Sequence, residues 1–139
     1  EFGVDTRHTI VADALIAEHL DKDYNKAIEL YNEFLNINKG YRYAEVYIDI
    51  ARCYRLLGEF RKANKQLESI YGTSLVYIWD TDYEYALLYK DMKSYDKALD
   101  KVETFLDHYQ YADNNFIKVN RAKELKTDLL NLIKGSNGF

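Results

Sequence analysis

Residues with the chemistry to bind a metal ion occur in one suggestive stretch, DKDYNK, at residues 21–26. This stretch imitates the start of a calcium-binding loop, whose ligands follow at fixed positions along the chain. Its sixth residue is Lys26, where such a loop requires glycine, and its twelfth is Asn32, where the loop requires glutamate. We therefore interpret the stretch as an acidic turn that caps the next helix.

Histidine and cysteine side chains are scattered. His8 and His19 lie eleven residues apart without a third ligand at suitable spacing, and His108 is isolated. Cys53 has no histidine near it, so we expect a small buried apolar residue rather than a nucleophile. The sequence therefore predicts no catalytic site, metal or cofactor, and the protein is not expected to be an enzyme.

The charge of the chain limits its partners. With 19 basic and 23 acidic residues the net charge is -4, which argues against a nucleic-acid partner. Basic residues near the C-terminus are interrupted by Glu124 and Asp128, as on a solvated helix face. No apolar run reaches the about 20 residues that membrane insertion requires. With one cysteine and no apolar leader at the start, we expect a cytoplasmic protein, although a removed signal peptide would leave no trace.

Apolar residues recur with helical spacing along the chain. Tyr47, Ile50, Ala51 and Tyr54 repeat at intervals of three and four residues, and Gly58 supplies a turn. The absence of proline leaves such helices uninterrupted. The same pattern predicts helices at about residues 7–20, 24–37, 43–57, 60–72, 80–92, 95–109 and 115–134. The stretch SLVYIWD, residues 74–80, also suits a short extended segment.

One short pattern occurs three times: an aromatic residue, any residue, lysine and alanine. Its alanines are Ala27, Ala63 and Ala98, which lie 36 and 35 residues apart. Helix pairs repeated at such a period bury their apolar faces by stacking, and a small alanine lets two helices approach closely. The sequence therefore predicts three stacked helix pairs.

The pattern resembles the tetratricopeptide-repeat family. The matching residues of the middle repeat are Tyr47, Ile50, Ala51, Tyr54, Gly58, Phe60, Ala63 and Leu67. The first repeat departs from the family pattern, because Leu15 and Glu18 stand where a small residue and a tyrosine are usual. The family's proline is also missing, and the period exceeds the usual value of about 34.

The resemblance implies an all-α fold: a right-handed α-solenoid of three helix-turn-helix repeats plus a C-terminal capping helix. We expect one domain over residues 1–139, with repeats at about 7–40, 43–77 and 80–112 and the capping helix at about 115–134.

The resemblance also implies a binding surface. In this family the first helix of each pair lines a concave groove that holds a peptide or a partner's helix. The candidate groove residues here are Ala12, Ile16, His19, Ile48, Arg52, Arg55, Tyr83, Leu87, Lys90 and Lys123. Part of the apolar set can instead serve helix packing.

We accordingly expect a protein–protein interaction module, a scaffold or adaptor, whose partner presents an acidic, amphipathic peptide or helix. The arginines suit carboxylates, unless Glu45 and Asp80 neutralise them internally. The alternative is a self-associating assembly subunit that uses the same repeats to form a homo-oligomer.

Overall fold

The computed structural model describes residues 6–38, 44–71, 78–110 and 116–137. These residues form helices and no strand, in the order α1 (Thr6–His19), α2 (Tyr24–Ile37), α3 (Ala44–Leu56), α4 (Phe60–Glu68), α5 (Ile78–Asp91), α6 (Tyr95–His108) and α7 (Ile117–Asn137). The expected all-α helical repeat is therefore confirmed for the described part of the chain. Of the ambiguous stretch SLVYIWD, residues 78–80 begin α5, and residues 74–77 lie outside the described residues.

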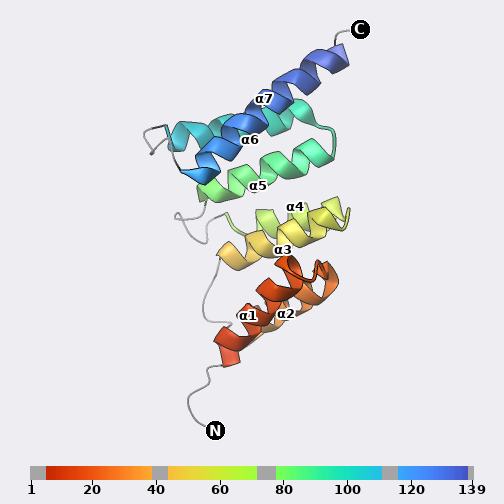
Figure 1. The fold of residues 1–139 in the computed structure, drawn as a ribbon, viewed down its shortest axis with the longest axis vertical. Coiled ribbons are helices and arrows are strands. Elements are labelled where there is room, and N and C mark those ends of the chain that lie inside the picture. The colour runs from red at the N-terminus through yellow and green to blue at the C-terminus, as the bar shows by residue number, and fades with distance from the viewer. Residues whose placement is uncertain (1–5, 39–43, 72–77, 111–115, 138–139) are drawn as a thin grey trace. The chain divides into compact units, whose positions relative to one another are not determined.

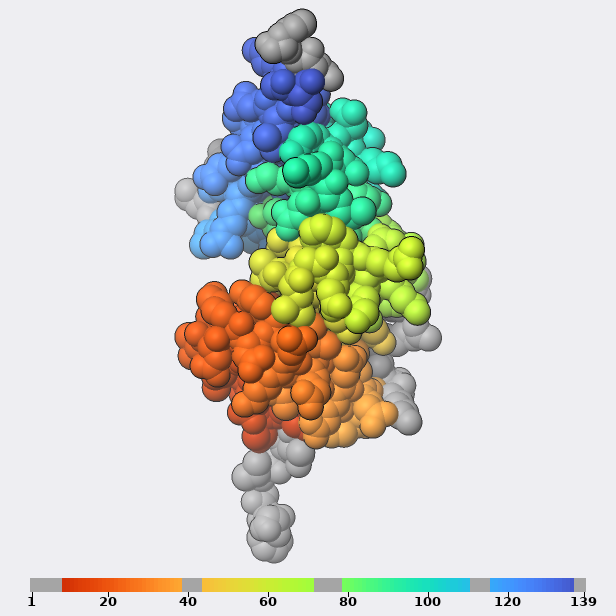
Figure 2. All heavy atoms as spheres, turned by 90° about the vertical axis from the view of Figure 1, so that its right-hand side faces the viewer, coloured from red at the N-terminus to blue at the C-terminus, as the bar shows by residue number. Residues whose placement is uncertain are grey.

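The chain divides into two compact units, Glu1–Leu75 and Val76–Phe139. Unit 1 contains the pair α1–α2, followed by the pair α3–α4, with α2 against α3 (Figure 1). Unit 2 contains the pair α5–α6, with α7 packed along α6. On the face shown in Figure 2, the side chains of α1 and α2 are in contact in unit 1, and those of α6 and α7 are in contact in unit 2.

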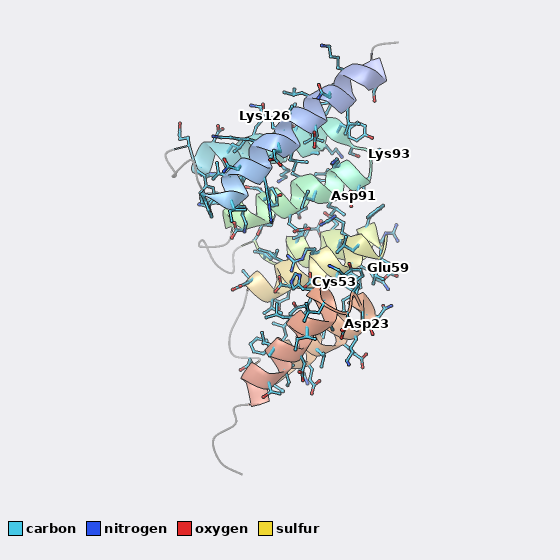
Figure 3. All side chains as sticks on the ribbon, viewed as in Figure 1. Asp23, Cys53, Glu59, Asp91, Lys93 and Lys126 are labelled. Atoms are coloured by element: carbon cyan, nitrogen blue, oxygen red, sulfur yellow. The ribbon has the colours of Figure 1, made fainter. Side chains whose placement is uncertain are left out.

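The turn inside each helix pair has the same backbone conformation. Lys22, Gly58 and Lys93 have φ angles of 55°, 80° and 65°, in the left-handed region. These positions are 36 and 35 residues apart, which is the period of the repeated alanines. Asp23, Glu59 and Lys93 mark the turns in Figure 3. A left-handed residue reverses the chain sharply after a helix, so each second helix can fold back on the first.

The alanines of the repeated pattern are buried in all three helix pairs. Ala27, Ala63 and Ala98 are at most 1% exposed. The core of unit 1 includes Tyr31 and Ile50, and that of unit 2 includes Val102 and Phe105. Small residues at buried positions allow two helices to pack closely, and larger core residues fill the remaining space.

The lysine of the repeated pattern also has a structural role. The ammonium group of Lys62 lies 5.7 Å from the ring centre of Tyr54, and that of Lys97 lies 5.8 Å from the ring centre of Tyr89. Both partners of the second contact follow those of the first by 35 residues. Such cation–π contacts connect the two helices of a pair at their turn.

Two helix ends differ from the predicted ones by more than one residue. The prediction carries the fourth helix to residue 72, but α4 ends at Glu68. The hydroxyl of Ser69 donates to the carbonyl of Gln66 at 2.6 Å, and the amide of Ile70 donates to the carbonyl of Leu67, which tightens the last turn. Helix α7 continues past the predicted end at 134 and includes Gly135, since one glycine weakens a helix without ending it.

Candidate functional site

The first helices of unit 1 present the first six candidate residues. Ala12, Ile16 and His19 are exposed on α1, and Ile16 is 45% exposed. On α3, the candidate residues Ile48, Arg52 and Arg55 are partly buried. This part of the surface therefore combines apolar side chains with cationic ones.

Arg52 is held by two carboxylates of unit 1. Its Nε donates to Glu18 Oε2 at 2.5 Å, and its Nη2 donates to Asp49 Oδ1 at 2.5 Å. The other oxygen of Glu18 accepts a hydrogen bond from the hydroxyl of Tyr31 at 2.8 Å and lies 3.5 Å from His19 Nε2. These contacts join α1, α2 and α3. Glu18, at 2% exposed, is buried at the centre of this cluster.

The two carboxylates of the cluster titrate differently. Burial acts to raise the pKa of Glu18, but the hydrogen bond and charge of Arg52, together with the Tyr31 hydroxyl, hold it below its usual value. Burial raises the pKa of Asp49 to about 6 against the attraction of Arg52, and the charge of Glu18 adds to the rise. One guanidinium cannot fully compensate a buried and a partly buried carboxylate, and within the described ranges Asp49 has no further donor comparable to the Tyr31 hydroxyl at Glu18.

This cluster changes the interpretation of the arginine pair. The sequence suggests Glu45 and Asp80 as internal partners of the arginines, but Arg52 binds Glu18 and Asp49. Glu45 is exposed, and Asp80 lies 3.1 Å from Lys118 in unit 2. The sequence does not identify Glu18 as the partner of Arg52. In the sequence, Glu18 is noticeable only because it stands where the family usually has a tyrosine.

The candidate residues of α5 belong partly to the core of unit 2. Tyr83 and Leu87 are half-buried against the core cluster, and the ring of Tyr83 lies 5.4 Å from that of Phe105. Lys90 is also partly buried. Packing therefore accounts for part of the apolar set, while one side of these residues remains accessible to a partner.

Lys123 lies on α7 and lines a cavity between α6 and α7. The cavity has a volume of about 480 Å³, and its lining residues are Leu106, Asp107, Tyr109, Gln110, Val119, Lys123, Lys126 and Thr127. Figure 3 marks the position of Lys126 on α7. All eight residues belong to unit 2, so the cavity is complete within that unit.

The residues considered for chemistry lie apart in the structure. Cys53 is fully buried in α3, and burial raises the pKa of its thiol to about 12, so it is not a thiolate at neutral pH (Figure 3). Asp23 accepts a hydrogen bond from the amide of Lys26 at 3.1 Å, which is the helix-capping role expected for DKDYNK. The side chain of His8 lies outside the described residues. His108 stacks on Trp79, with ring centres 3.3 Å apart.

Two further kinds of feature are missing from the described ranges. Within them, no three or more histidine, cysteine or acidic side chains are grouped so as to hold a metal ion. None of the described helices has the length and apolar character needed to cross a membrane.

Neither a family model nor a curated protein matches the sequence. Solved structures do match its fold. The TPR domain of Sgt2 from Aspergillus fumigatus superposes with a TM-score of 0.76 at 19% identity, over 96% of this chain and 83% of that one. Two structures of MamA superpose with TM-scores of 0.61 and 0.60, both at 19% identity, over 96% of this chain and 77% and 81% of theirs. The chain therefore has the tetratricopeptide-repeat fold, as the sequence resemblance implies.

Proposed function

We propose that the protein is a protein-interaction module that binds an acidic, amphipathic segment of a partner on the first helices of its repeats. The observation that carries this proposal is the composition of the surface on α1 and α3. There Ile16 is 45% exposed, and Ile48 and Arg55 are partly accessible. An apolar side chain of the partner can pack on the isoleucines while a carboxylate binds Arg55.

The two arginines have different roles in this proposal. Arg52 neutralises Glu18 and orients α3 against α1, so its main contribution is to the structure that carries the surface. A charge reversal at Arg52 would place three carboxylates together in a partly buried cluster and damage unit 1 itself. Arg55 is therefore the better residue on which to test recognition in unit 1, and Lys90 is its counterpart 35 residues later.

Catalysis is not part of the proposal. The thiol of Cys53 is buried, and the described histidines make contacts with neighbouring side chains rather than with a nucleophile. Fold likeness also favours a binding role, since repeat folds of this kind offer extended surfaces to other proteins. That support is an analogy at the level of the fold.

A random peptide library displayed on phage tests the proposal, because such a selection needs no identified partner. Peptides selected on the purified protein should be enriched in acidic and apolar residues. Arg55→Glu should weaken binding of the selected peptides by at least tenfold, because a charge-assisted contact becomes a repulsion. Arg61→Glu, at an exposed position on α4, makes the same charge change and should leave binding unaltered.

Selection of basic peptides, or equal binding by the Arg55→Glu and Arg61→Glu variants, would contradict the proposal. Circular dichroism on each variant separates a loss of recognition from a loss of fold.

Self-association is the alternative function, and one feature of α1 favours it. Leu15 and Ile16 are 40% and 45% exposed near the C-terminal end of this helix, and Leu20, directly after the helix, is 75% exposed. Ala12, Ile16 and Leu20 lie four residues apart, and with Leu15 beside them they form a short apolar stripe suited to packing against a second copy. Light scattering over a hundredfold range of concentration tests this function. A mass that rises with concentration and is restored to the monomer value by Leu20→Glu supports it, and a constant monomer mass excludes it.

A further inference from the structure

The cavity between α6 and α7 has the features of a built binding site. Its volume of about 480 Å³ falls within the range of pockets that enclose small ligands or large side chains. Leu106, Tyr109 and Val119 supply apolar surface, and Lys123 and Lys126 supply positive charge. Apolar walls with a few convergent charged groups are typical of specific recognition.

The floor of the cavity is held in place by the core of unit 2. Val119 is 3% exposed, and Leu106 and Tyr109 pack against the core cluster. The ring of Tyr109 lies 4.7 Å from that of Phe105 and 5.7 Å from that of Phe116. These contacts restrict Tyr109 from two sides, so the floor is largely preformed, and a ligand need not order it on binding.

The two lysines at the cavity differ in whether they pair with a carboxylate. The ammonium group of Lys126 lies 3.4 Å from Glu103 Oε2, so part of its charge is compensated. Lys123 is exposed, and among the described residues no carboxylate lies within ion-pair distance of its ammonium group. A carboxylate of a ligand can therefore bind Lys123 without breaking an ion pair of the described residues. Asp107, exposed on α6 across the cavity, repels that carboxylate and directs it toward α7.

We propose that this cavity binds an apolar side chain of a partner protein that is followed directly by an acidic residue. The apolar side chain occupies the space between Leu106, Tyr109 and Val119, and the carboxylate binds Lys123. This inference rests on the proposed function, because it assigns a specific subsite to the same class of partner. It also fixes the orientation of the bound segment, because its acidic residue must lie on the α7 side of the cavity.

A titration of the full chain with a short peptide tests the assignment. The probe is the blocked peptide acetyl-Gly-Ser-Phe-Glu-Ser-Gly-amide, followed by amide chemical shifts of the 15N-labelled protein. The shifts should concentrate at Leu106, Tyr109, Val119 and Lys123. Replacing the peptide's phenylalanine by alanine, or its glutamate by lysine, should each weaken binding by about tenfold or more.

Protein variants supply the second arm of the test. Lys123→Glu should weaken binding of the probe by at least tenfold, and Asp107→Asn should strengthen it by two- to fivefold, about what removing one screened like charge gives. Lys134→Glu makes the same change at an exposed position of α7 outside the cavity and should leave the affinity unchanged. Equal affinity of the Lys123→Glu and Lys134→Glu variants, or shifts confined to other helices, would overturn the assignment.

The outcomes separate this inference from the proposed function. Library-selected peptides whose binding is lost in Arg55→Glu but kept in Lys123→Glu would overturn the cavity site and leave the function standing. Probe binding lost in Lys123→Glu, with selected peptides indifferent to Arg55→Glu, would support the cavity and overturn the role of the α1–α3 surface.

Discussion

Glu18 determines what Arg52 does in this protein. At the position where the resembling family has tyrosine, Glu18 is buried, accepts a hydrogen bond from Tyr31 and pairs with Arg52. A buried carboxylate is costly unless it is paired and hydrogen-bonded, so the arginine that completes it cannot be replaced without loss of stability. A residue selected from sequence for recognition therefore serves first to hold helices together.

The titration of Asp49 makes the stability of the folded protein depend on pH. Its pKa is raised to about 6 in the folded state, from 3.8 as the ordinary value. Between these two values the folded state binds the proton more tightly than the unfolded state, so stability falls as pH rises through this window. A difference of about two pKa units corresponds to at most about 3 kcal/mol.

Asp49→Asn removes this titration, because the amide does not ionise. As pH rises from 4 to 7, the melting temperature of the wild-type protein should fall relative to that of the Asp49→Asn variant. Thermal melts of both proteins at steps of half a pH unit measure the difference. If the wild-type protein instead gains stability relative to the variant over this range, Asp49 is stabilised as the anion, and our description of the cluster is wrong.

At the residue scale, the sequence predicts which side chains are accessible better than it predicts which side chains contact one another. The candidate residues of α1 and α3 are accessible, wholly or partly, and their role in binding stays a prediction. The pairing of Glu18 with Arg52 was not predictable, because it joins residues 34 positions apart. It depends on how α1 and α3 are rotated about their axes, which helical spacing alone does not determine.

At the scale of the helices, local chemistry carries most of the information. Every predicted helix start falls within two residues of the observed one. The early end of α4 was not predicted, because the apolar pattern continues through Ile70, which is fully buried although it lies outside the helix. Periodicity detects a buried residue but not the serine hydrogen bond that ends the helix before it.

Gly58 is the helix-turn residue whose conformation can be tested most directly. Its φ angle is 80°, and a Cβ atom added there would meet nothing within 4 Å. Gly58→Ala should therefore destabilise unit 1 by about 1 to 2 kcal/mol through backbone strain alone. Chemical denaturation measures the change.

Gly135→Ala in α7 is the matched control, since its added Cβ also meets nothing within 4 Å and its backbone is helical. It should stabilise the protein by up to about 1 kcal/mol. A Gly58→Ala variant as stable as the wild type would show that the turn does not require a left-handed residue.

At the scale of the molecule, the 35- to 36-residue period predicts the number of helix pairs. The described residues form three such pairs and a further helix, and the fold matches solved tetratricopeptide-repeat structures at 19% identity. The repeated alanines Ala27, Ala63 and Ala98, which carry this period, are buried in all three pairs, as stacked helix pairs require. The cavity between α6 and α7 could not be predicted from the sequence, because the residues that line it follow no regular spacing.

The most direct test of the proposed function is to locate the surface that binds a partner segment. An acidic, amphipathic peptide selected from the library is titrated into the 15N-labelled protein, and the shifted amides are assigned. We predict that shifts in unit 1 concentrate on first-helix residues such as Ile16, Ile48 and Arg55, and that the α6–α7 cavity responds when the peptide carries an apolar–acidic pair. Shifts confined to exposed residues of the second helices, such as Glu33, Arg61 and Asp100, would contradict the proposal.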